Sequence, residues 1–109
     1  MSCKQYTVVV PAVTTLPIVT KSLNEFQAQK FIMSIKQTDG DKQSAGELMV
    51  TWYGSVPTIT VDHVFYAGVG DTINFQVLAS YNGNDVVVEI ENNETFSLTI
   101  DLAEMGTVS

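Results

Sequence analysis

The sequence contains no arginine, one cysteine and one histidine among its 109 residues. Its five lysines stand against twelve aspartates and glutamates, so the formal charge is −7, a sign that opposes binding to a nucleic-acid backbone. No run of about 18 apolar residues occurs, and the N-terminus lacks the charged and apolar regions of a secretory signal. We therefore expect neither nucleic acid nor a membrane as a partner.

The scarcity of cysteine and histidine limits the disulfides, catalytic sites and metal sites that the chain could form. Cys3 has no second cysteine to pair with, which predicts a fold without an internal disulfide, made in a reducing cytoplasm. His63 lies in the apolar phase of its segment, and no sequence neighbour supplies the nucleophile that a catalytic base would serve. Within one chain these two residues are too few for a zinc site, although a trimer axis could gather three copies of His63. We expect no enzyme activity, no bound metal and no cofactor.

Alternation of apolar and polar residues with a period of two is what the sequence has in abundance, and it predicts half-buried β-strands. Six segments show it, and their apolar phases begin at Phe31, Gly46, Ile59, Ile73, Val86 and Phe96. No helix is predicted beyond a single turn within Ser22 to Gln29, where Ser22 could act as a cap and Glu25 follows three residues later. The chain is therefore predicted to be all-β.

Turn signals separate the predicted strands. Asn82-Gly83 is a preferred pair for a tight type I′ hairpin, and Asn92-Asn93 is a weaker turn of the same kind, so the last three strands are predicted to form a meander. Three further loops are expected at residues 39–41, 54–57 and 67–71. This even spacing, in a chain long enough for one domain, predicts a single antiparallel β-sandwich of jelly-roll type.

Residues 1–28 differ from the sandwich domain predicted over residues 29–109. They are rich in threonine and valine, and Pro11 and Pro17 exclude central positions in a sheet. Two interpretations stay open: an extended arm that adds a strand to a neighbouring subunit, or two edge strands of the chain's own fold. For the arm, the expected apolar anchor contacts are Tyr6, Val8, Val10 and Ile18. In that case, removing residues 1–21 should leave the sandwich folded.

Aromatic residues provide a possible binding surface. Trp52 and Tyr53 are adjacent on a predicted strand and must point to opposite faces, so one of them belongs to the core. An exposed Tyr53 together with Tyr66 and Tyr81 could contact a sugar or another subunit. These residues support an alternative prediction, that the chain is a carbohydrate- or receptor-binding module.

Two stretches of the sequence follow a pattern found in a known group of proteins. Residues 28–35 read AQKFIMSI, and residues 46–54 read GELMVTWYG. This pattern, and the strands that follow it as far as residue 101, resembles small β-sandwich modules in structural proteins of tailed bacteriophages. Most of the resemblance lies in two short segments, Lys30-Phe31 and Glu47-Leu48-Met49-Val50.

The resemblance implies a virion component without enzyme activity. Such a protein would be a capsid decoration, head-fibre, tail or neck protein, assembled in the cytoplasm of a bacterial host and located in the virion. Its expected partners are further copies of the chain, with a trimer favoured, and other virion proteins such as the major capsid or tail protein.

Overall fold

The computed structural model describes residues 4–109, apart from the side chains of residues 67 and 68, and Cys3 lies outside this range. Eight strands make up the described fold: β1 (Gln5–Val10), β2 (Thr15–Ser22), β3 (Ala28–Gln37), β4 (Gln43–Tyr53), β5 (Thr60–Gly70), β6 (Phe75–Asn82), β7 (Asp85–Asn92) and β8 (Leu98–Val108). Over the same residues there is no helix that could cross a membrane. The predicted all-β class is confirmed.

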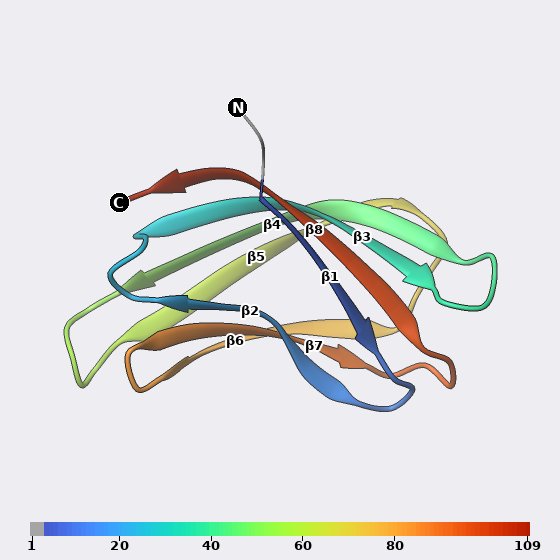
Figure 1. Cartoon of the computed structure of the whole chain (residues 1–109), viewed down its shortest axis with the longest axis horizontal. Coiled ribbons are helices and arrows are strands. Elements are labelled where there is room, and N and C mark those ends of the chain that lie inside the picture. Colours follow the sequence, from blue (N-terminus) through green and yellow to red (C-terminus); the bar gives the residue numbers. More distant parts are fainter. Residues whose placement is uncertain (1–3) are drawn as a thin grey trace.

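The strands form two antiparallel sheets that lie one over the other (Figure 1). The larger sheet has the order β1-β8-β3-β4-β5, and the smaller has the order β2-β7-β6. Pairing of the first strand with the last, and of the second with the seventh, is the nested arrangement of a jelly roll. The strands β3, β4 and β5 instead form a meander within the larger sheet, and the whole is the predicted β-sandwich.

The core lies between the sheets and is filled by the apolar phases that the sequence predicts. Every second residue is buried along most of β3 and all of β7, in the Leu48–Val50 part of β4, and in the Leu98–Leu102 part of β8. The most deeply buried side chains include Phe31, Met33, Ile35, Leu48, Ile90, Leu98 and Ile100. Alternation fixes which face of a strand is buried, so the inward phase of all six predicted strands is correct.

The predicted meander of the last three strands is wrong in its second half. β6 and β7 form a hairpin, but β8 leaves the smaller sheet and lies between β1 and β3 in the larger one. The hairpin turn also differs, because Asn82 pairs with Asp85 and the central residues are therefore Gly83 and Asn84. Only Gly83 has a positive φ, 64°, which fits a type II′ turn rather than type I′.

Asn92 explains why the chain crosses between sheets where a tight turn is predicted. Its side chain is 1% exposed, and its amide nitrogen lies 3.1 Å from the carbonyl oxygens of Val10 and Pro11 and 2.9 Å from that of Phe96. Its side-chain oxygen accepts a hydrogen bond of 2.9 Å from the backbone N–H of Glu94. Asn92 thus satisfies the backbone of two irregular connections at once, and this holds the crossover in place.

Residues 5–22 supply edge strands to the chain's own two sheets, which is the second of the two interpretations of the N-terminal segment. β1 pairs with β8 along its whole length, and β2 pairs with β7. Val10 and Ile18 are 0% and 4% exposed, so their predicted role as contacts to a neighbour is corrected: they belong to the chain's own core.

Two smaller predictions also change. Between β2 and β3 the chain makes one turn, in which the N–H of Glu25 donates to the carbonyl of Ser22 over 3.0 Å, and no helix forms. The Glu25 carboxylate accepts a hydrogen bond of 3.3 Å from the N–H of Ser22, so the expected capping contact is present without the helix. The loop predicted at residues 67–71 is mostly strand, because β5 continues to Gly70.

Candidate functional site: the two sides of the sandwich

The sandwich has two sides at which strands end the sheets. β1 and β2 form one side, and β5 and β6 form the other. An edge strand presents unpaired N–H and C=O groups, which can pair with a strand of another chain unless the edge is protected. The two sides differ in this protection, and this difference defines the candidate site.

The β1/β2 side carries the features that protect edges. β1 has six residues and lies between Lys4 and Pro11. β2 contains Pro17, which has no N–H to donate, and its pairing with β7 shifts register between Pro17 and Val19. Short length, proline, lysine and a register shift are the means by which natural sheets prevent edge pairing.

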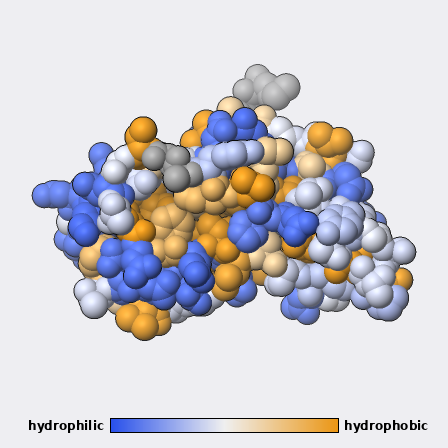
Figure 2. Space-filling model, turned by 180° about the vertical axis from the view of Figure 1, so that it is seen from behind, coloured by the Kyte–Doolittle hydropathy of each residue, from blue (hydrophilic) through white to orange (hydrophobic). Residues whose placement is uncertain are grey.

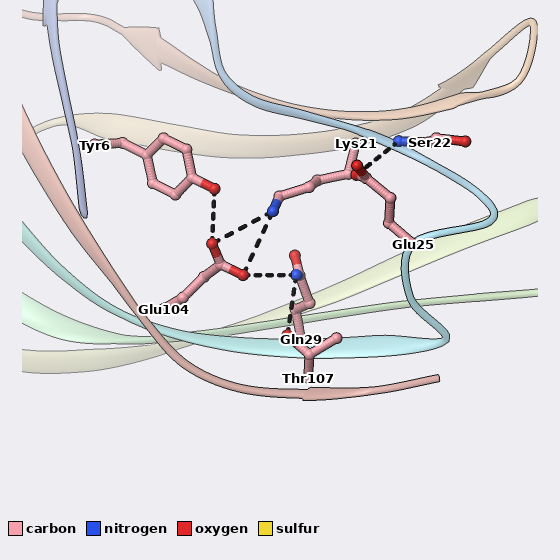
Figure 3. A network of polar contacts seen from close by, with 7 residues as sticks. All are labelled: Tyr6, Lys21, Ser22, Glu25, Gln29, Glu104 and Thr107. Atoms are coloured by element: carbon pink, nitrogen blue, oxygen red, sulfur yellow. Dashed lines mark hydrogen bonds and ion pairs between the residues drawn. The ribbon is translucent and has the colours of Figure 1, made fainter. Parts of the chain in front are cut away.

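A polar network ties the sheets together on this side (Figure 3). Glu104 of β8 lies at its centre: the Tyr6 hydroxyl donates to Glu104 Oε2 over 2.7 Å, and Lys21 Nζ of β2 lies 3.3 Å from the same oxygen. Gln29 Nε2 donates to the other carboxylate oxygen over 2.9 Å. The Tyr6 ring also faces the ammonium groups of Lys4 and Lys21, at 5.4 and 5.8 Å from its centre.

Charges in this network stabilise one another. Partial burial alone would raise the pKa of Glu104, but the hydrogen bond from Tyr6 and the charge of Lys21 together lower it below its ordinary value. Burial would likewise lower the pKa of Lys21, yet interaction with Tyr6 and the charge of Glu104 raise it. Both groups are therefore held in their charged forms, and the β1/β2 side is fixed internally.

The β5/β6 side has none of these protective residues in its regular strands. β6 contains no charged residue and no proline, and the segment Thr60–Tyr66 of β5 contains one charged residue, Asp62. A register shift between Ala45 and Glu47 of β4 marks an irregularity only beyond Tyr66. The inward side chains are partly exposed here, and Phe65 and Phe75 meet edge to face with ring centres 5.4 Å apart.

Apolar side chains also lie on the outer face of the larger sheet next to the β5 edge. We call Ile32, Met49, Val64 and Tyr66 the outer patch, and each is between 41% and 50% exposed. Met49 is opposite Val64 in the register, and both line a shallow depression of about 170 Å³ that also includes Asp62 and His63. β1 and β2 face the viewer in Figure 1, so Figure 2 shows the β5/β6 side, where apolar side chains gather across the middle between polar margins.

The tyrosines predicted to form a binding surface are not brought together. Tyr53 and Tyr66 share the outer face of the larger sheet but lie at distant rows, opposite Thr60 and Glu47 respectively. Tyr81 points inward from β6 in the other sheet. Trp52 is half-buried, and its indole N–H donates to the Phe26 carbonyl over 2.6 Å, so it supports the fold. No sugar-stacking platform is assembled from these residues.

The other predicted site residues have structural roles. Tyr6 serves the Glu104 network, and Val8 packs against the core. His63 lies on the inward face of β5 opposite Val50. Among residues 4–109, no three histidine, cysteine, aspartate or glutamate side chains are placed to hold a metal ion.

The sequence analysis did not single out Val64 and Met49 as candidate site residues, although a signal for them exists. Both are apolar residues in the polar phase of their strands, which places them on the outer face. Ile32 departs from alternation in the same way. Three such departures on adjacent strands indicate an apolar outer patch.

Comparisons with known proteins add little to this geometry. No family model matches the sequence, and no curated protein matches it. Among solved structures, the chain is similar to a tailspike protein, gp49 from Acinetobacter baumannii bacteriophage Fri1, a capsular polysaccharide depolymerase, with a TM-score of 0.42 and 11% identity. The match covers 95% of this chain and 17% of the tailspike chain, and the depolymerase activity in that name is the tailspike's own.

Proposed function

We propose that the protein is a non-enzymatic structural component of a tailed-phage virion and joins its assembly through strand pairing at the β5/β6 side. The observation that carries this proposal is the difference between the two sides of the sandwich. Protection is concentrated at β1 and β2, whereas the segments Thr60–Tyr66 of β5 and Phe75–Asn82 of β6 together contain no proline, no lysine and one charged residue, Asp62. An edge of this kind favours pairing with another chain.

The sequence resemblance to phage structural modules supports the virion as the place of assembly. The two segments that carry this resemblance lie side by side in the β3–β4 hairpin. Phe31 lies opposite Leu48 in the core, and Lys30 Nζ lies 3.3 Å from Glu47 on the outer face. The pattern is therefore a folding signature of this hairpin. The partners that we propose for the protein are further copies of the chain and the major capsid or tail protein. Strand pairing with either requires no catalytic group.

Purification of particles tests the proposed function. A tagged chain would be produced in bacteria infected with the phage that encodes it, and particles would be banded in a density gradient. We expect the chain to be found in the particle band, as detected by immunogold microscopy. The variant Val64→Glu, with a charge beside the β5 edge, should be lost from particles. Absence of the unchanged chain from the particles would contradict the proposal.

Val9→Glu provides the matched control. Val9 lies on β1 at the opposite edge of the same sheet and is 49% exposed, against 50% for Val64. The same change at this position should leave incorporation intact. Loss of incorporation with Val9→Glu but not with Val64→Glu would place the contact on the β1/β2 side instead.

A further inference from the structure

The regular part of β5 can pair with a second copy of itself. Thr60–Tyr66 is a seven-residue segment whose central residue is His63. In an antiparallel pair of two such segments about a two-fold axis, His63 lies opposite His63 of the second copy. A residue before His63 then lies opposite the residue that follows His63 by the same number of positions in the second copy. Such a pairing would extend the five-stranded sheet of one copy into that of the next.

We propose that the occupant of the β5 edge is a second copy of this chain, paired antiparallel with His63 at the two-fold axis. The inference rests on the proposed function, since it names the partner that the β5/β6 side binds. Two-fold pairing is the commonest symmetry of soluble homo-oligomers, and it uses the same surface on both copies.

The residues that this register brings together are complementary. Val61 faces Phe65 of the second copy on the inward side, and Thr60 faces Tyr66 of the second copy on the outer side. Pairs of an aromatic and a β-branched residue are favourable across strands. Asp62, the one charged residue of the segment, faces Val64 of the second copy, so like charges do not oppose each other.

In outline, the β5/β6 side is large enough to hold a dimer interface. The molecule measures 43 × 32 × 19 Å, and Figure 2 views it along the shortest of these axes. The β5/β6 side is therefore one of the two broad sides of the molecule, and the β1/β2 side is the other. A stable interface needs about 800 Å² from each partner. Pairing at β5 also covers the partly exposed side chains of Val61 and Phe65 at the inward side of the edge.

Cross-linking of single cysteines tests the register. In the background Cys3→Ser, the variant His63→Cys places two thiols directly opposite each other, within reach of a disulfide. We expect a covalent dimer after mild oxidation, seen without reductant on a gel. Val61→Cys in the same background is the control: the two copies of this residue are offset by four positions, about 13 Å along the strand, and should not cross-link. Cross-linking at Val61 but not at His63 would overturn the register.

Charge substitutions test the same pairing without cysteine, and they remain informative if His63→Cys fails to fold. Val64→Glu sets a carboxylate against Asp62 of the second copy at two symmetric places and should weaken the dimer about tenfold. Val64→Lys sets an ammonium group against the same carboxylate and should keep the dimer. Val9→Glu should have no effect. Equal weakening by Val64→Glu and Val64→Lys would contradict the facing of Val64 and Asp62.

Light scattering of the unchanged protein separates this inference from the proposed function. We expect a mass twice the 11.9 kDa of the chain. A monomer at all concentrations, or a trimer without cross-linking at His63, would overturn the second copy as the β5 partner. Incorporation into particles would stand in either case, because that result depends on any strand partner. A dimer combined with absence from particles would instead overturn the virion role.

Discussion

Val9 and Val64 lie at opposite edges of the five-stranded sheet with nearly equal exposure, 49% and 50%. Their surroundings differ. Val9 stands near a proline on a six-residue strand, next to a side that is tied by the Glu104 network. Val64 stands in the middle of an eleven-residue strand without lysine or proline. The same side chain at two edges therefore separates the effect of exposure from the effect of edge protection.

The ion pair between Lys21 and Glu104 is expected to contribute to stability. Lys21→Met leaves a partly buried carboxylate without its cation, and we predict a loss of about 2 kcal/mol in the free energy of unfolding. Lys30→Met removes the exposed partner of Glu47 and should cost less than about 0.5 kcal/mol. Urea unfolding of both variants measures the difference. Equal losses would show that the network is no stronger than a surface pair.

The pH dependence of the stability that the Lys21–Glu104 ion pair contributes follows from the pKa shifts of the two groups. The pKa of Glu104 is lowered from 4.5, so its stabilisation is complete above about pH 4.5 and is lost as the pH falls through the lowered value. The pKa of Lys21 is raised from 10.5, so its stabilisation is complete below that pH and is lost as the pH rises further. The difference in stability between the unchanged protein and Lys21→Met should therefore be constant from about pH 5 to about pH 10 and shrink in acid.

Asn92 is predicted to be more important than its neighbour Asn93. Asn92→Ala leaves three buried or partly buried carbonyl groups without a side-chain donor and should lower stability by about 3 kcal/mol. Asn93 is exposed and its side chain reaches only Glu91, so Asn93→Ala should change stability by less than about 0.5 kcal/mol. Thermal unfolding of the pair is the measurement, and a similar effect of both would contradict the role assigned to Asn92.

Removal of residues 1–21 should unfold the protein. The deleted segment holds β1, most of β2, and the core residues Val10, Ile18 and Val19. Both sheets would lose an edge strand, and the inward faces of β7 and β8 would be exposed to water. Circular dichroism of the truncated chain tests this. A cooperative unfolding transition near that of the full chain would mean that these strands are dispensable, as the arm interpretation expects.

The two sides of the sandwich are also expected to differ in packing energy. Phe31→Ala removes a side chain that is 1% exposed and should cost about 3–5 kcal/mol. Phe75 is only partly buried, so Phe75→Ala should cost roughly 2 kcal/mol in the monomer. Denaturant unfolding at low protein concentration gives both values. A loss at Phe75 as large as that at Phe31 would show that the β5/β6 side is packed as fully as the core.

The strands and their inward faces could be predicted from the sequence because alternation is a local property. Phe31, Leu48 and Ile90 are buried for the same reason that they are recognisable: each belongs to a run with a period of two. The position of β8 could not be predicted this way. It depends on Asn92, whose polar type suggests a turn but whose amide serves carbonyls more than 80 residues away.

The candidate site shows the same division. The network around Glu104 joins Tyr6, Lys21 and Gln29 from three other strands, and no local pattern links residues so distant in sequence. The lack of charge in β6 and in most of β5 is visible in the sequence, as is the apolar character of Val64 and Met49. The lack of charge indicates a possible pairing edge only once β5 and β6 are known to be edge strands, and the order of strands in the sheets shows that they are.

Hydrogen exchange at two protein concentrations tests the central claim, that the chain associates through the β5 edge, most directly. Edge amides exchange fast in a monomer because about half of them have no partner in the sheet, and strand pairing protects them. We predict that protection within Thr60–Tyr66 rises with protein concentration, while that of Gln5–Val10 stays constant. Protection of β5 that is independent of concentration, or a rise confined to β1, would contradict the account.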